Sequence, residues 1–188
     1  MSGEQEEIES PHNKPFLFDG GERKLAAHLR QVARGKSVLF HGTSLGSLIV
    51  RTDTLLVPSS GDPSISFTRS PEWAAHFAGL PKTDDDGLAT VFVFEREALR
   101  YNYRLELHQD SIEEGAHNKF EMEERVYERD IRPVSKLLHA ITFSVHSRVI
   151  TLTQPADVRT IYLPTARAFK EVRQQEIREA LDRLSPTR

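Results

Sequence analysis

The chain has 188 residues, of which 38% are hydrophobic and 28% are charged, and its formal net charge is -3. This length and composition predict one soluble globular domain, and the charge excludes the global basic field that an obligate nucleic-acid binder shows. The sequence contains no cysteine, which excludes disulfides and thiolate metal sites and fits a cytoplasmic protein. No run approaches the roughly 18 apolar residues of a membrane span, so no membrane partner is expected.

The first part of the chain predicts a tail, a helix and several short strands. Residues 1–14 are polar and acidic and predict a disordered tail, which leaves a single domain over 15–188. The spacing of Leu25, Leu29 and Val32 predicts a helix from about residue 20 to residue 34. A strand at 37–40, helical turns at 44–50 and strands at 55–57 and 65–68 follow. Ser70-Pro71 is a typical helix start, with serine as the N-cap and proline at the first helical position.

The second part continues this alternation and ends in a helix. Residues 83–87 predict an acidic turn, and 106–119 predict a polar connection. Strands are expected at 90–94, 123–127 and 140–145, with weaker candidates at 149–152 and 160–163, and a helical turn at 134–138. The apolar spacing over 165–184 predicts a C-terminal helix. The pattern indicates an α+β fold with short strands in the middle and helices at both ends.

A histidine stands where the first predicted strand ends. His41 is followed by Gly42 and Thr43, whose small size lets the backbone approach a ligand closely. An imidazole at this place can bond a ribose hydroxyl. Alternatively, His41 is a partly buried histidine at a strand end that bonds the backbone only.

Hydroxyl groups alternate with apolar residues in the strand expected at 65–68. Ser66 and Thr68 lie two residues apart and therefore face the same side of the strand. They can position a carboxylate or bond a ribose, and Arg69 at the strand end can meet a diphosphate. The alternative is an ordinary solvated strand face.

Three glutamates compete for one role at the strand expected at 123–127. Strand alternation places Glu121 and Glu123 on one face together with Arg125, and Glu124 on the other face with Met122 and Val126. If Ser66 and Thr68 line a cleft, Glu121 and Glu123 should face it. Glu124 is then expected to be solvent-exposed or paired on the outer face, where its removal would change stability by little, while Met122 and Val126 enter the core. A charged edge strand is the alternative.

Taken together, the three segments resemble the motifs of the ADP-ribosyltransferase superfamily. His41-Gly42-Thr43 is similar to the His-Gly-Thr of its diphtheria-toxin and poly(ADP-ribose) polymerase branch, and Ser66-Phe67-Thr68 to the Ser-Thr-Ser of its cholera-toxin branch. Glu121-x-Glu123 has the Glu-x-Glu form. The pattern, over about residues 37–145, resembles small proteins of this superfamily from bacteria and phages. The usual nicotinamide-stacking tyrosine is not evident, and Trp73 or Phe77 would take its place.

The resemblance implies two small, bent, antiparallel-rich sheets with an NAD cleft between them. It implies a mono-ADP-ribosyltransferase or NAD glycohydrolase that uses NAD as its substrate and needs no metal, with a protein or nucleic-acid acceptor. In that site His41, Gly42, Thr43, Ser66, Thr68 and Arg69 would bind NAD. Ser66 would orient Glu123, Glu123 would stabilise the oxocarbenium ion, and Glu121 would assist the acceptor.

Two further hypotheses remain open from the sequence. One is a catalytically degenerate module of the same fold that binds NAD, ADP-ribose or a nucleic-acid end. The other is an enzyme similar to the tRNA 2′-phosphotransferases, which share the fold but would want more basic residues in the cleft. The eight histidines show no metal-ligand spacing, which agrees with a site that has no metal.

Overall fold

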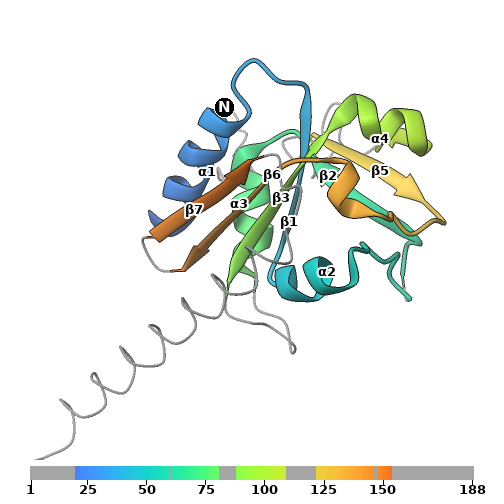
Figure 1. Cartoon of the computed structure of the whole chain (residues 1–188), viewed down its shortest axis with the longest axis horizontal. Helices are drawn as coiled ribbons and strands as arrows, with labels where there is room; N and C mark the ends of the chain where they lie inside the picture. The colour runs from blue at the N-terminus through green and yellow to red at the C-terminus, as the bar shows by residue number, and fades with distance from the viewer. Residues whose placement is uncertain (1–19, 60, 81–87, 109–121, 146–147, 154–188) are drawn as a thin grey trace, which may run out of the picture.

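The computed structural model describes residues 20–59, 61–80, 88–108, 122–145 and 148–153 (Figure 1). The fold is α+β, as the sequence predicts. Its elements in chain order are α1 (Gly20–Val32), β1 (Val38–Thr43), α2 (Gly46–Thr52), β2 (Ser64–Thr68), α3 (Pro71–Gly79), β3 (Ala89–Glu95), α4 (Arg96–Asn102), β4 (Leu105–Leu107), β5 (Glu123–Tyr127), the 3₁₀ helix η4 (Val134–Lys136), β6 (Leu138–Val145) and β7 (Arg148–Thr153).

The seven described strands form one antiparallel sheet in the order β4-β5-β2-β1-β3-β6-β7. The expectation of two separate sheets is therefore wrong for the described residues. The sheet nevertheless has two halves, because β1 and β2 share a single residue pair, Phe40 with Thr68, whereas β1 pairs with β3 over its whole length. Neighbouring backbones that part after one pair leave room between them for side chains.

Strand alternation directs β1 and β3 into two different cores. On one face, α1 and α3 cover Phe40, Val91 and Val93. On the other face, Leu39 and Phe92 join buried side chains from α2, α4 and the middle of β2. Both faces of these strands are thus buried, which explains why residues 90–94 are almost continuously apolar.

Helix α3 lies directly on β1. The helix begins as the sequence predicts: Ser70 Oγ accepts a hydrogen bond from the backbone N–H of Trp73 at 3.3 Å, and Pro71 follows the cap. A Cβ atom added to Gly42 would lie 2.0 Å from the carbonyl oxygen of Ala74. The glycine therefore permits contact between the backbones of β1 and α3, which is a structural need beside the ligand approach expected from the sequence.

Other elements differ from the expectations or fall outside the described residues. The predicted connection at 106–119 overlaps β4, whose three residues pair with β5, and α4 precedes it. The short strand expected at 55–57 is one bridge between Leu55 and Ile131. The predicted tail at 1–14, turn at 83–87, strand at 160–163 and helix at 165–184 lie outside the described residues. No helix in the described segments is long and apolar enough to cross a bilayer.

Candidate functional site

A pocket of about 220 Å³ opens where the two halves of the sheet meet. Residues from β1, β2, α3 and β5 line it: Phe40, His41, Gly42, Ser66, Phe67, Thr68, Phe77 and Glu123. Five of these, His41, Gly42, Ser66, Thr68 and Glu123, are among the predicted site residues. The structure thus brings residues from three separate sequence motifs to one place.

His41 spans the gap between β1 and β2. Its Nδ1 atom lies 2.9 Å from the carbonyl oxygen of Ser66, and its ring lies against Phe67 with the centroids 5.9 Å apart. A carbonyl oxygen only accepts hydrogen bonds, so Nδ1 carries the hydrogen and the neutral ring has its lone pair at Nε2. The side chain therefore donates a hydrogen bond to a strand carbonyl across the gap.

Glu123 is a buried carboxylate at the pocket wall, 6% exposed. Arg125, two residues further along the same strand, holds both of its oxygens: Nε lies 2.9 Å from Oε1 and Nη2 lies 3.0 Å from Oε2. Arg125 also pairs with Asp62. Burial lowers the pKa of Arg125, but its hydrogen bonds and charge interactions with Glu123 and Asp62 outweigh burial, so its pKa is raised. The guanidinium is therefore always charged.

The register of β2 and β5 places Glu123 on the face expected from the sequence. Thr68 lies opposite Glu123, and Ser66 lies opposite Arg125, so all four side chains share one face. The resemblance implies that Ser66 orients Glu123, but within the described segments no hydrogen bond joins the two side chains. The Ser66 side chain is exposed and makes no hydrogen bond within the described segments. Arg125 fixes the carboxylate in its place.

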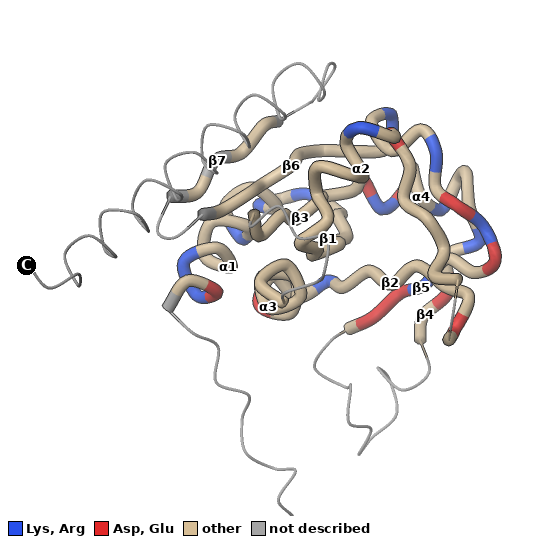
Figure 2. The backbone as a smooth tube through the Cα atoms, turned by 90° about the horizontal axis from the view of Figure 1, so that it is seen from below, with Lys and Arg blue, Asp and Glu red and all other residues tan. Residues whose placement is uncertain are grey.

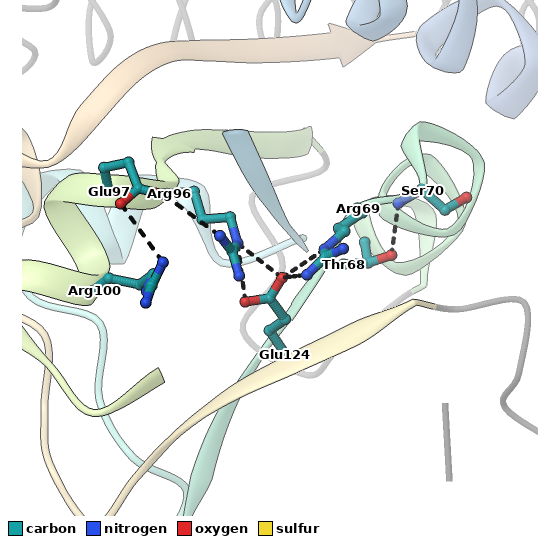
Figure 3. Close-up of polar contacts among 7 residues, drawn as sticks. All are labelled: Thr68, Arg69, Ser70, Arg96, Glu97, Arg100 and Glu124. Atoms are coloured by element: carbon teal, nitrogen blue, oxygen red, sulfur yellow. Dashed lines mark hydrogen bonds and ion pairs between the residues drawn. The ribbon is translucent and has the colours of Figure 1, made fainter. Parts of the chain in front are cut away.

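Glu124 is paired, as one of the two expectations has it, but it is buried, and the expectation of an exposed outer face is wrong. Its side chain is 1% exposed and lies between two arginines (Figure 3). Arg69 Nε is 2.5 Å from its Oε1 atom, while Arg96 Nε is 3.0 Å from Oε1 and 3.2 Å from Oε2. The hydrogen bond to Glu124 is the main cause of a raised pKa at Arg96. The face of the sheet opposite the pocket is covered by the core around Phe67 and by α4, so it is not exposed to solvent.

Several predicted residues lie away from the pocket. Arg69 contacts Glu124 and does not line this pocket. Thr43 is buried at the end of β1, where its Oγ1 accepts a hydrogen bond from Leu45 N at 3.0 Å and so supports the start of α2. Met122 is 48% exposed at a positive φ of 50° and does not enter the core. Glu121 lies outside the described residues.

Two residues join the site that the sequence did not assign to it. The sequence could have indicated Arg125, because strand alternation places it on the same face as Glu123. His108 follows β4, and its Nε2 lies 3.9 Å from Glu123 Oε2. No local pattern indicates it, since β4 reaches the site only by pairing with β5. Phe77, one of the two aromatic candidates, lines the pocket, and Trp73 stacks on it from one turn earlier in α3.

The pocket offers a carboxylate, an imidazole, hydroxyls and an aromatic ring. Among the described residues, no group of three histidine, aspartate or glutamate side chains is arranged to hold a metal ion. Comparisons of the chain with protein-family models, with curated proteins and with solved structures return no match. Inference about function rests on the chemistry of these side chains.

Proposed function

We propose that this chain is an NAD-dependent mono-ADP-ribosyltransferase or NAD glycohydrolase. The observation that carries the proposal is the meeting of buried Glu123 and His41 in one pocket between the two halves of the sheet. A carboxylate and a ribose-binding group must be close together in any site that polarises the nicotinamide glycosidic bond. The motif resemblance supports the same reaction.

The reaction breaks the bond between C1′ of the ribose and the nicotinamide nitrogen. The bonding electron pair leaves with nicotinamide, and positive charge develops at C1′ and the ring oxygen. Glu123 would stabilise that charge, and the imidazole of His41 would bond a ribose hydroxyl. The nucleophilic atom of the acceptor, or water, then bonds to C1′ and loses its proton. Phe77 offers a ring face for nicotinamide.

One observation favours a second candidate, a module that binds NAD or ADP-ribose without turnover. Arg125 contacts both oxygens of Glu123, which offsets the negative charge that the transition state requires. In an enzyme, the same contact would orient the carboxylate for its action on substrate. Binding and turnover must therefore be measured separately.

The test measures nicotinamide release from NAD by chromatography and NAD affinity by calorimetry, both on the full chain. We expect release by the wild type, loss of release in Glu123→Gln, and NAD affinity within a few-fold of the wild type in that variant, because the carboxylate acts mainly on the transition state. Glu95→Gln is the matched control, since Glu95 is exposed and outside the pocket lining. Binding without release supports the second candidate, and absence of both rejects the proposal.

A further inference from the structure

A second and larger hollow, about 430 Å³, lies beyond the pair that joins the two halves of the sheet. Its walls come from the end of α1, the start of β1, the segment between β2 and α3, and the start of α4. Nine residues line it: Arg30, Ala33, Lys36, Ser37, Val38, Phe40, Arg69, Pro71 and Arg96. We call this hollow the basic groove. It shares only Phe40 with the pocket beside Glu123.

The basic groove is lined by four cationic side chains and no acidic one. In the tube view, a basic segment stands between β2 and α3 (Figure 2). The carboxylates that neutralise part of this charge lie outside the lining: Glu72 pairs with Arg30, and Glu124 pairs with Arg69 and Arg96. A chain with a net charge of -3 thus gathers local positive charge in one concavity.

Glu124 holds two of these cations in place. Its buried carboxylate lies between Arg69, which follows β2, and Arg96, which begins α4 (Figure 3). Two guanidiniums side by side repel each other, and a carboxylate between them fixes both planes. The arginines therefore enter the groove wall already oriented, which lowers the ordering cost of binding an anion.

Donors remain after these contacts are counted. Arg69 uses Nε and Nη2 on Glu124, and Arg96 uses Nε on Glu124 and Nη1 on Glu97. Within the described segments, Arg69 Nη1, Arg96 Nη2 and the Lys36 ammonium make no further polar contact. Three donor groups from three separate segments thus line the same groove.

We infer that the basic groove binds the phosphate of a nucleotide, either free or as part of a nucleic-acid strand. Oriented guanidiniums and an ammonium match phosphate oxygens. Val38, Phe40 and Pro71 give the same groove an apolar side for a base or sugar. A concave site fits a single nucleotide better than it fits a flat lipid surface. The inference stands independently of the proposed NAD reaction.

The experiment measures binding of AMP, orthophosphate and a phosphoserine peptide by calorimetry, and of a short labelled single-stranded RNA by fluorescence anisotropy. We expect AMP to bind more tightly than orthophosphate or the peptide. Arg69→Gln should weaken AMP binding about tenfold, because one charge-assisted contact is lost. Arg104→Gln is the matched control, since Arg104 is exposed and outside the groove. RNA binding much tighter than AMP binding, and steeply dependent on salt, identifies a strand; equal binding identifies a free nucleotide.

A second variant keeps the test decisive if Arg69→Gln unfolds. Lys36 is exposed, and its side chain has no partner in the described segments, so Lys36→Glu should fold normally and still weaken AMP binding by several-fold. The inference is overturned if AMP and RNA both fail to bind at millimolar concentration. It is also overturned if Lys36→Glu leaves their affinity unchanged, or if the phosphoserine peptide binds as well as AMP.

Discussion

Glu123 and Glu124 are neighbours in β5 with the same side chain, yet they serve opposite faces of the sheet. Glu123 is 6% exposed at the wall of a pocket, and its arginine partner comes from the same strand. Glu124 is 1% exposed away from that pocket, and its partners come from two other elements. Burial alone therefore does not separate a candidate catalytic carboxylate from a structural one.

The two glutamates differ in where their arginine partners lie in the chain. Arg125 lies two positions from Glu123, so their contact joins no distant elements and leaves the carboxylate beside the empty pocket volume. Glu124 links β5 to the residue after β2 and to the first turn of α4, and so connects both ends of the basic groove. Under the proposed function Glu123 is the carboxylate that acts on substrate, whereas Glu124 joins separate segments of the fold.

The largest expected effect that tests this comparison is on turnover. Glu123→Gln keeps the size of the side chain but removes its charge, and we expect nicotinamide release to fall by about 100-fold or more. The free energy of unfolding should fall by only about 1 kcal/mol, because one charge-assisted pair becomes a neutral hydrogen bond. Steady-state release and urea unfolding measure the two quantities. Full turnover in this variant would contradict the proposal that Glu123 acts on substrate.

The next effect is on stability. Glu124→Gln leaves two arginines side by side without their shared charge, and we expect the free energy of unfolding to fall by about 2 kcal/mol. This loss is smaller than that for a fully buried pair, because the Arg69 side chain is 39% exposed and can rotate toward solvent. Urea unfolding of both glutamate variants under identical conditions measures the difference. A larger loss in Glu123→Gln than in Glu124→Gln would reverse the structural assignment.

The central strands of the sheet could be predicted from the sequence for a physical reason. Residues 90–94 are β-branched and aromatic, and Ser66 and Thr68 alternate with apolar residues, so local pattern and tertiary position agree. Helix α4 lacks such a signal, because Leu99 is its only fully buried residue within the described chain. Strand β4 has three residues and exists through its pairing with β5. Elements of this kind follow from tertiary contact, not from periodicity.

The candidate site shows the same limit. Alternation with period two correctly predicts that Glu123 shares a face with Ser66 and Thr68. It cannot predict whether the opposite face is solvent or core, and that is where the expectation for Glu124 fails. The residues that contact Glu124 on that face are Arg96, 28 residues earlier in the chain, and Arg69, 55 residues earlier. Sequence patterns assign a face, whereas long-range packing assigns its environment.

A smaller effect sharpens the account of Glu123. Arg125→Lys keeps the positive charge but cannot contact both carboxylate oxygens with a planar fork. If Arg125 orients Glu123 for catalysis, nicotinamide release should fall about tenfold while NAD affinity changes little. If Arg125 instead suppresses catalysis by offsetting the charge, release should rise. Arg129→Lys, at an arginine outside the pocket lining, is the control.

The smallest effect on stability is expected at Ser66. Its side chain is exposed and makes no hydrogen bond within the described segments, so Ser66→Ala should change the free energy of unfolding by less than about 0.5 kcal/mol. Ser59→Ala, an exposed serine outside the pocket, is the matched control. The hydroxyl still lines the pocket, and a hydrogen bond from it to a ribose would raise KM for NAD several-fold when removed. An unchanged KM would mean that the second motif contributes backbone shape, through the Ser66 carbonyl that His41 holds, and no side-chain contact.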